Sequence, residues 1–318
     1  MTRRRTIAIV GGTGAQGGGL AHAILGDRSG AFAARVLTRR PESARARDLA
    51  RQGAEVVAAD LDHPPSLERA FAGAYGAFCV TNFWEHFSPE REIAQARAMA
   101  AAARRAGLVH VIWSTLEDTR RFVPLDDGRM PTLRGRYKVP HFDSKGESDR
   151  FFGEAGVPTT YLLTSFYWDN LVHFRLGQHR DEHGRLRIVL PMGDRRLPGI
   201  AVEDIGRCAF GIFQRGEDLI GQRVGVAGEH LTGAAMAEQL SCALGEPVDY
   251  VAVSPERYRG LDLPGAEELA NMFQFKRDFE GVFCGARDVA RSRQLNPALQ
   301  TFAEWLRGHV AELRATAR

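Results

Sequence analysis

Cysteine is scarce in this chain, and its few copies are scattered. The four cysteines among 318 residues show no paired spacing, which argues against a zinc site and against a disulfide framework. His173, His179 and His183 also lack the usual spacing of metal ligands. We therefore expect no bound metal and a reducing, cytoplasmic environment.

Long hydrophobic runs and a strong charge imbalance are missing as well. No stretch reaches the ~18 apolar residues of a membrane span, and the N-terminus lacks an apolar signal region. The net charge of +3 is too small to indicate nucleic-acid binding. The sequence therefore favours neither a membrane protein nor a direct nucleic-acid binder.

The first half of the chain alternates between short apolar segments and helical segments. Runs rich in Val, Ile and Ala predict strands at 7–10, 35–38, 55–60, 77–81, 109–114 and 160–163. Helices are predicted between them at 17–25, 41–52, 66–71, 89–106 and 141–154. Repeated βαβ units build a parallel sheet with helices on both faces. We therefore predict an α/β fold, a Rossmann-type doubly wound parallel sheet, over residues 1–165.

The second half of the chain is less regular. Residues 117–140 are rich in charge, Pro and Gly and predict a long loop, which in a compact domain is usually functional or disordered. Asp204 is predicted to cap a helix. Further strands are expected at 186–190, 224–227 and 248–253, with helices at 233–244 and 299–313. This pattern predicts a smaller α+β lobe over 166–318, substrate-side or regulatory, although strands near 186–228 can return to the first sheet.

A glycine-rich turn follows the first predicted strand. Its sequence is Gly11-Gly12-Thr13-Gly14-Ala15-Gln16-Gly17, with Gly11, Gly14 and Gly17 in GxxGxxG spacing. Glycine is needed in such a turn because the chain bends sharply, the backbone approaches a pyrophosphate and the helix packs close to the strand. The helix start then offers free N–H groups to the phosphates. The turn predicts dinucleotide binding, with a purely structural turn as the alternative.

The end of the second strand indicates which dinucleotide binds. A site for NAD usually places Asp or Glu there, on the ribose 2′-hydroxyl, but this chain has Arg39 and Arg40. Arg39 can form two parallel hydrogen bonds to a 2′-phosphate. The pair therefore predicts NADP(H), unless both arginines only end an exposed strand.

Residues after the third, fourth and sixth strands complete the predicted cofactor site, because ligands of open α/β sheets lie at the carboxyl ends of strands. They are Asp60, Leu61, Thr81, Asn82, Phe83, Tyr167 and Asn170. Asp60 and Leu61 should lie beside the adenine, unless Asp62 simply caps the next helix. Tyr167 and Asn170 suit a nicotinamide or substrate wall, with core packing as the alternative.

Several stretches together resemble the NmrA-like family of atypical short-chain dehydrogenase/reductases, and most closely its HSCARG-type NADPH sensors. These stretches are residues 9–18, 80–85, 141–147 and 268–275. The resemblance implies a Rossmann domain, a smaller C-terminal lobe and a cleft between them. It also implies NADP(H) bound through Thr13, Gly14, Gln16 and Arg39. The family contains both reductases and regulators.

The candidate catalytic residues are Lys145, His141 and Ser114. Typical short-chain reductases carry Tyr-x-x-x-Lys on a helix, which puts both side chains on one face. Here His141 stands four residues before Lys145, and Tyr137 stands eight before it. His141 can donate a proton near neutral pH or serve as a structural or ligand-contact residue. In related phenylpropanoid reductases the corresponding Lys is thought to be the general acid/base, so Lys145 is the first candidate and also an expected cofactor contact.

Two functions are compatible with these residues. The first is an NADPH-dependent reductase of a small carbonyl, quinone, enone or imine, in which Ser114 or Thr115 orients the substrate. The alternative is a non-catalytic NADP(H) redox sensor that regulates a partner protein, which the missing Tyr favours. The expected partners are a small-molecule substrate or a regulated protein, together with a second copy in a homodimer.

Overall fold

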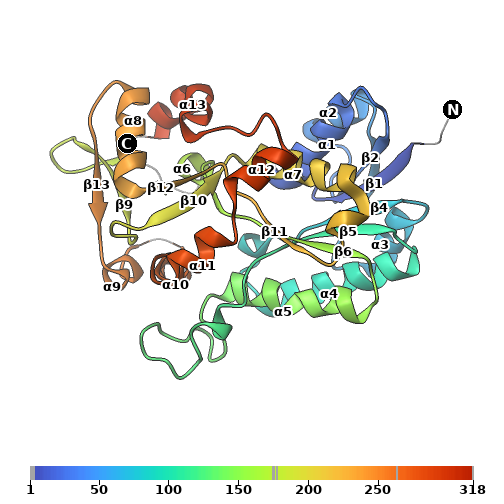
Figure 1. Ribbon diagram of the computed structural model, residues 1–318, viewed down its shortest axis with the longest axis horizontal. Coiled ribbons are helices and arrows are strands. Elements are labelled where there is room, and N and C mark those ends of the chain that lie inside the picture. Colours follow the sequence, from blue (N-terminus) through green and yellow to red (C-terminus); the bar gives the residue numbers. More distant parts are fainter. Residues whose placement is uncertain (1–3, 174–175, 177, 263, 317–318) are drawn as a thin grey trace.

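The computed structural model describes residues 4–173, 176, 178–262 and 264–316. Its centre is a seven-stranded parallel sheet in the order β11-β6-β5-β4-β1-β2-β3 (Figure 1). The strands are β1 (Arg5–Val10), β2 (Phe32–Thr38), β3 (Glu55–Ala58), β4 (Gly76–Cys79), β5 (His110–Thr115), β6 (Thr159–Leu163) and β11 (Arg223–Gly225). The strand order reverses between β1 and β4, and ligands of open α/β sheets bind at such a switch point. The predicted Rossmann-type fold is confirmed.

Helices cover both faces of this sheet (Figure 1). One face carries α1 (Ala15–Gly26), α2 (Ala44–Arg51), α7 (Val202–Arg215) and α12 (Val289–Leu295). The other carries α3 (Pro64–Phe71), α4 (Pro89–Arg105) and α5 (Pro140–Glu154). Each face buries its own apolar cluster, as expected for a sheet whose strands are apolar on both sides. Within the part of the chain that the structure describes, none of the helices is long and apolar enough to cross a membrane.

Helices α1 and α7 touch through their backbones. A Cβ atom on Gly19 would lie 2.6 Å from the Glu203 carbonyl oxygen, and one on Gly206 would lie 2.1 Å from the Leu20 nitrogen. Both distances are too short for any side chain, so glycine is what permits this approach. Helix α7, although it follows residue 165, thereby packs directly on the helix of the glycine turn.

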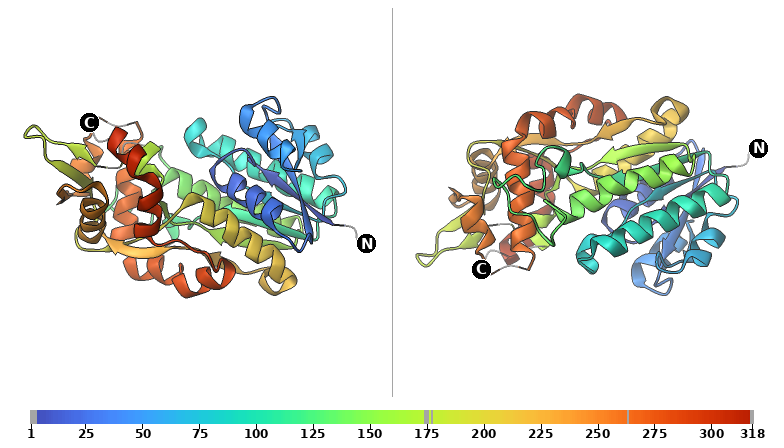
Figure 2. Two further views of the ribbon diagram at one scale, coloured as in Figure 1. Left: turned by 90° about the horizontal axis from the view of Figure 1, so that it is seen from above. Right: turned by 90° about the horizontal axis from the view of Figure 1, so that it is seen from below.

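The rest of the chain forms a region with two small sheets and its own core (Figure 2). Its sheets have the orders β12-β10-β7 and β13-β9-β8. Their strands are β7 (Phe166–Tyr167), β8 (His179–Arg180), β9 (Leu186–Leu190), β10 (Arg196–Ile200), β12 (Glu229–Thr232) and β13 (Val248–Ala252). The helices are α6 (Asn170–His173), α8 (Gly233–Leu244), α9 (Pro255–Arg259), α10 (Ala266–Asp278), α11 (Glu280–Gly285) and α13 (Phe302–Thr316). Short 3-10 helices are η1 (Phe83–Glu85), η2 (Thr119–Arg121) and η3 (Gly216–Leu219).

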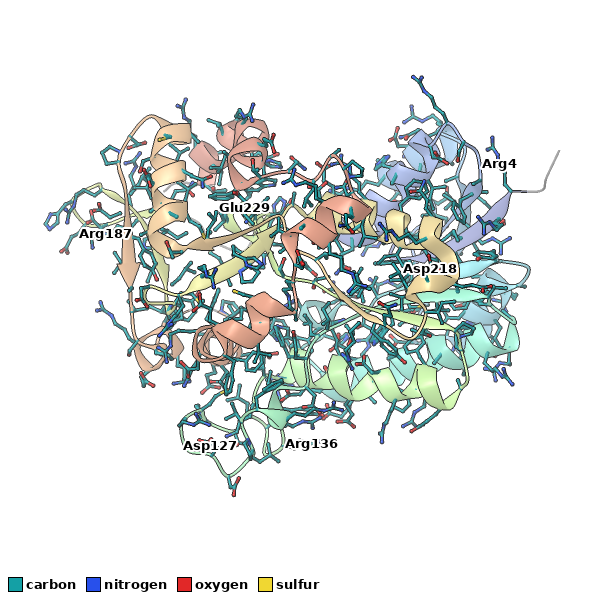
Figure 3. All side chains as sticks on the ribbon, viewed as in Figure 1. Arg4, Asp127, Arg136, Arg187, Asp218 and Glu229 are labelled. Carbon is teal, nitrogen blue, oxygen red and sulfur yellow. The ribbon has the colours of Figure 1, made fainter. Side chains whose placement is uncertain are left out.

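The segment between β5 and α5 contains only η2 and one isolated bridge, in line with the predicted loop. Figure 3 shows the part that carries Asp127 and Arg136 extending away from the rest of the ribbon. Two amides of α10 hold this segment. Asn271 donates to the Lys138 carbonyl at 2.6 Å, and Gln274 donates to the Arg129 carbonyl at 2.7 Å. The segment is therefore fixed to the C-terminal region.

One local prediction is wrong. Asp204 does not cap α7, because the helix begins at Val202 and Ala201 is its N-cap. The Asp204 carboxylate is buried and accepts hydrogen bonds from Asn296 and Gln300 instead. Strand β10 leads directly into α7 and contains Pro198, which cannot donate to a neighbouring strand. Its partner β7 pairs only beyond Pro198, at Gly199 and Ile200.

Candidate active site

The glycine turn connects β1 to α1 with the geometry of a phosphate cradle. Gly11 has a φ of +62°, a value that favours glycine. A Cβ on Gly17 would lie 2.6 Å from the Gly11 carbonyl oxygen. Gly14 is the N-cap of α1 and supplies no side chain to the helix N-terminus. The first N–H groups of α1 can therefore bind an anion, and the turn fits a diphosphate.

The side chain of Gln16 joins two other predicted site residues, Ser114 and Tyr167, which lie on different elements. Its amide nitrogen donates to the Tyr167 hydroxyl at 2.7 Å, and its oxygen accepts from the Ser114 hydroxyl at 2.8 Å. Burial raises the pKa of Tyr167, so the phenol stays neutral. Thr115, next to Ser114, is fully buried and donates to Asp149 at 2.6 Å. Of the two hydroxyl groups at the end of β5, the one on Ser114 therefore reaches the glycine turn.

Arg39, after β2, forms an ion pair with Glu85 in η1. Two nitrogens of the guanidinium lie 2.5 and 2.9 Å from the two carboxylate oxygens. Both side chains are about half exposed, at 51% and 41%, and the hydrogen bond to Glu85 raises the pKa of Arg39. Such exposed pairs are weak, so a 2′-phosphate can compete for the guanidinium.

Arg40 is exposed, and its backbone N–H donates to the Thr38 hydroxyl. The Thr13 hydroxyl of the glycine turn lies 3.4 Å from the Thr38 hydroxyl.

The turn after β3 is held by its own hydrogen bonds. The Asp60 carboxylate accepts from the Asp62 backbone, and the Ser66 hydroxyl accepts from the Asp60 backbone. Leu61 is half-buried against the sheet. The alternative role of Asp62 as a helix cap is wrong, because His63 is the N-cap of α3. Asp62 pairs with Arg91 on α4 instead.

The residues after β4 form an aromatic corner. Phe83 is 1% exposed, and its ring lies 5.6 Å from Trp84 and 5.7 Å from His141. Asn82 is exposed, and its carbonyl accepts the N–H of Glu85. This corner brings the end of β4 against the start of α5.

Lys145, on α5, reaches the end of β4 and is held there by three acceptors. Its ammonium lies 2.6 Å from the Thr81 hydroxyl, 3.2 Å from the Thr81 carbonyl and 3.2 Å from the Glu92 carboxylate. Glu92 is fully buried and also accepts from Thr81 and Ser144. The ammonium therefore has two hydrogen-bond acceptors on Thr81 and an ion-pair partner in Glu92. Glu92 carries no signal of this role in the sequence, because it stands on an Ala-rich helix far from Lys145 in the chain.

His141 lies one helical turn before Lys145 and pairs with Glu268 of α10. One oxygen of Glu268 lies 2.6 Å from the ring Nδ1 and 2.7 Å from the His141 backbone nitrogen. Both residues are 5% exposed. The ring packs 4.9 Å from Trp84 and 4.9 Å from Phe142. Because a carboxylate only accepts, Nδ1 carries a hydrogen. Glu268 begins one of the stretches that resemble the NmrA-like family, but nothing local indicates a partner 127 residues away.

Two other candidates lie apart from this group. Tyr137 precedes α5 and is buried, with its hydroxyl 3.5 Å from Glu90. Asn170 opens α6 and is half-buried, and no hydrogen bond among the described residues joins it to Gln16 or Tyr167. The structure thus assembles Gln16, Ser114 and Tyr167 at one point and Thr81, His141 and Lys145 at another.

Comparison with known proteins adds an independent line of evidence. A model of the NmrA-like family matches residues 3–306. The NmrA-like family domain-containing oxidoreductase notA' of Aspergillus versicolor is 29% identical, over 98% of this chain and 99% of that protein. The NAD(P)H azoreductase of Xenophilus azovorans is 28% identical, over 97% of this chain and 99% of that protein.

A solved structure shares the fold over the whole chain. It is the negative transcriptional regulator NmrA in complex with NADP, with a TM-score of 0.80, 22% identity and coverage of 100% of this chain and 99% of that one. The finer likeness to NADPH sensors of the HSCARG type stays a prediction. With a family model that spans nearly its full length, the chain belongs to the NmrA-like family.

Proposed function

We propose that this protein is an NADPH-dependent reductase of a small carbonyl, quinone, enone or imine. The glycine turn would hold the diphosphate, Arg39 with Arg40 the 2′-phosphate, and Asp60 with Leu61 the adenine. The nicotinamide end would lie among Thr81, Asn82, Phe83, Lys145, Tyr167 and Asn170. The uncapped start of α1 and the weak ion pair at Arg39 support this placement. Two relatives at 28–29% identity are named as oxidoreductases.

The pair of His141 and Glu268 carries the catalytic part of this proposal. When bound, NADPH supplies a hydride, and the substrate must also receive a proton. Glu268 occupies the Nδ1 side of the ring, so Nε2 is the atom that can pass a proton to the substrate. The carboxylate also stabilises the protonated ring and fixes its orientation, in the manner of a buried carboxylate beside a catalytic histidine.

Lys145 has a different role in this scheme. Its ammonium is hydrogen-bonded to Thr81 and paired with Glu92, so in this scheme it would position the cofactor and would not pass on a proton. From the end of β4 it would contact the cofactor ribose. Ser114 would orient the substrate oxygen, exchanging its bond to Gln16 for one to the ligand.

Transfer of a labelled hydride tests the proposal directly. Purified protein with deuterated NADPH, labelled at C4 of the nicotinamide, is incubated with a panel of quinones, enones, imines and carbonyl compounds. We expect NADPH oxidation with at least one class, and deuterium bound to carbon in the product when that class is an enone, imine or carbonyl compound; deuterium that reaches a quinone oxygen exchanges with water, so hydroquinone formation is the readout there. No oxidation above the rate without enzyme across the whole panel would contradict a reductase.

A second candidate function is NADP(H) sensing without turnover, and the pair of Arg39 and Glu85 favours it. A 2′-phosphate that binds Arg39 would release Glu85 and with it η1, whose Trp84 packs on His141. Hydrogen exchange of residues 82–88 measures this release. A sensor should show faster exchange with NADP⁺ than with NAD⁺; equal exchange would remove the support for sensing.

A further inference from the structure

Lysine is rare in this chain, and none of its copies is exposed. There are three lysines, and the other 39 basic residues are arginines. Lys138, Lys145 and Lys276 are 1%, 9% and 3% exposed. Lys138 donates to two carbonyl oxygens, and Lys145 is held by Thr81 and Glu92. The fold accounts for these two lysines but not for Lys276.

The Lys276 ammonium lies in a box of four phenylalanine rings. The ring centroids of Phe142, Phe166, Phe273 and Phe283 are 5.4–5.8 Å from Nζ. No described residue accepts a hydrogen bond from this ammonium, whereas the other two lysines each have at least two acceptors. Aromatic faces attract a cation, but they do not replace a counter-ion in buried surroundings.

The nearest charged groups leave Lys276 without a counter-ion. Arg287 is fully buried, and its guanidinium forms two bonds to the Glu117 carboxylate, at 2.6 and 3.0 Å. Glu117 is thus already paired, and the cluster of two cations and one carboxylate carries an excess positive charge. Burial and the positive charge of Arg287 lower the pKa of Lys276 to about 7, against the opposing effect of Glu117.

This cluster adjoins the candidate active site. Arg287 donates to the Thr164 carbonyl at 2.8 Å, and the Thr164 hydroxyl lies 3.3 Å from that of Tyr167. Lys276 follows Glu268 by two turns on α10. Phe142 follows His141 in the chain, and Phe166 precedes Tyr167. Two of the four rings therefore belong to the elements that carry candidate site residues.

We propose that Lys276 is a substrate-binding residue that takes an anionic oxygen, a carboxylate or phenolate, of a flat aromatic substrate. The ligand would supply the missing counter-ion, and its ring would pack on the phenylalanines. Each of these rings is at most 3% exposed, so the ligand has to displace one of them to enter. The identification of this ligand as the substrate rests on the proposed reductase function. The proposal that Lys276 binds an anion does not depend on that function.

A pair of probes that differ only in charge tests the site without turnover. The probes are 2-naphthoate and 2-naphthamide, titrated calorimetrically into the full chain with NADP⁺ at pH 7 in two buffers of different ionisation enthalpy. We expect 2-naphthoate to bind at least about tenfold more tightly, with uptake of roughly half a proton per ligand. Lys276→Met should remove this preference, whereas Arg277→Met, which removes the adjacent and more exposed cation, should keep it.

Equal affinity for both probes, a preference that survives Lys276→Met, or no binding of either probe would each overturn the anion site. If Lys276→Met does not fold, competitive acylation of the unmodified protein replaces it, because three lysines give three separable peptides. 2-Naphthoate should then move the pH midpoint of Lys276 acylation upward by at least one unit and leave that of Lys138 unchanged; an unmoved midpoint overturns the site. A protein that binds 2-naphthoate through Lys276 but never oxidises NADPH would refute the reductase and not the anion site.

Discussion

Glu268 holds His141 twice through a single carboxylate oxygen, once at the ring Nδ1 and once at the backbone nitrogen. The first contact fixes the ring and the second fixes the start of α5. His141, the candidate proton donor on a helix that covers the Rossmann sheet, is thereby positioned by α10, a helix of the C-terminal region.

Removing the imidazole should affect turnover much more than substrate binding. We expect His141→Asn to lower kcat by about 10²–10⁴-fold, the usual contribution of a positioned acid, with little change in KM. Glu268→Gln, which keeps the shape but loses the charge, should lower kcat less. His22→Gln, at an exposed position on α1, is the control and should be neutral. Unchanged kcat in His141→Asn would exclude His141 as the proton donor.

Glu85 should weaken NADPH binding, because it occupies the guanidinium that the 2′-phosphate needs. We expect Arg39→Ala to raise the Kd for NADPH by about 10–100-fold, the effect of losing roughly 1.5–3 kcal/mol of charge-assisted hydrogen bonding. The Kd for NADH should stay within a few-fold. Glu85→Gln should tighten NADPH binding.

Fluorescence titration with both cofactors measures these constants. Arg40→Ala, at the neighbouring exposed arginine, shows how much of the effect is due to net charge alone. Equal losses for NADPH and NADH in Arg39→Ala would argue against a 2′-phosphate contact.

Two adjacent glycines of the turn should respond differently to the same added methyl group. A Cβ on Gly17 would meet the Gly11 carbonyl at 2.6 Å, whereas one on Gly18 meets nothing closer than 3.6 Å. We expect Gly17→Ala to cost about 1–3 kcal/mol of unfolding free energy and to abolish tight NADPH binding. Gly18→Ala should be neutral or slightly stabilising, since alanine favours a helix. Urea unfolding and cofactor titration of both variants provide the comparison.

Removing the Lys145 cation should destabilise the fold, because Glu92 would remain buried without a partner charge. We expect Lys145→Met to lower the unfolding free energy by about 3–5 kcal/mol. The double variant with Glu92→Gln should recover much of this loss, since the buried charge is then gone. A loss below about 1 kcal/mol in the single variant would mean that Glu92 finds water or another partner.

Acid should destabilise the protein partly through His110, a fully buried residue of β5. Burial lowers its pKa from 6.5 to about 4. The folded chain therefore binds this proton less tightly than the unfolded chain, and stability falls as the pH drops from about 6.5 toward 4. The expected loss is roughly 3 kcal/mol.

The comparison for this effect is His110→Gln, which can still form a hydrogen bond with the Thr160 hydroxyl, as Nε2 does at 2.9 Å. Its unfolding free energy should fall less than that of the natural protein between pH 7 and 4. If the unfolding free energies of the variant and the natural protein fall by the same amount between pH 7 and 4, His110 does not contribute to the acid destabilisation.

Local signals in the sequence were sufficient for the parallel sheet and for the position of the glycine turn between β1 and α1. Alternating segments and glycine spacing act over a few residues, and their consequences can be worked out without knowing the fold. Glu85, Glu92 and Glu268 could not be assigned in this way, because each partner lies 46 or more residues away. The prediction for Asp204 failed for a related reason: its residue type is common at helix caps, but its distant partners Asn296 and Gln300 could not be foreseen.

The glycine contact between α1 and α7 limits how this molecule can move. Helix α7 starts where β10 ends, and its first N–H is held by Asp169 beside α6, so it is anchored in the C-terminal region while its backbone touches α1. A hinge rotation of that region would carry the phosphate-binding helix along or break the contact. We therefore expect cofactor exchange to depend on local rearrangement of residues 82–88, with the two halves of the molecule behaving as one rigid unit.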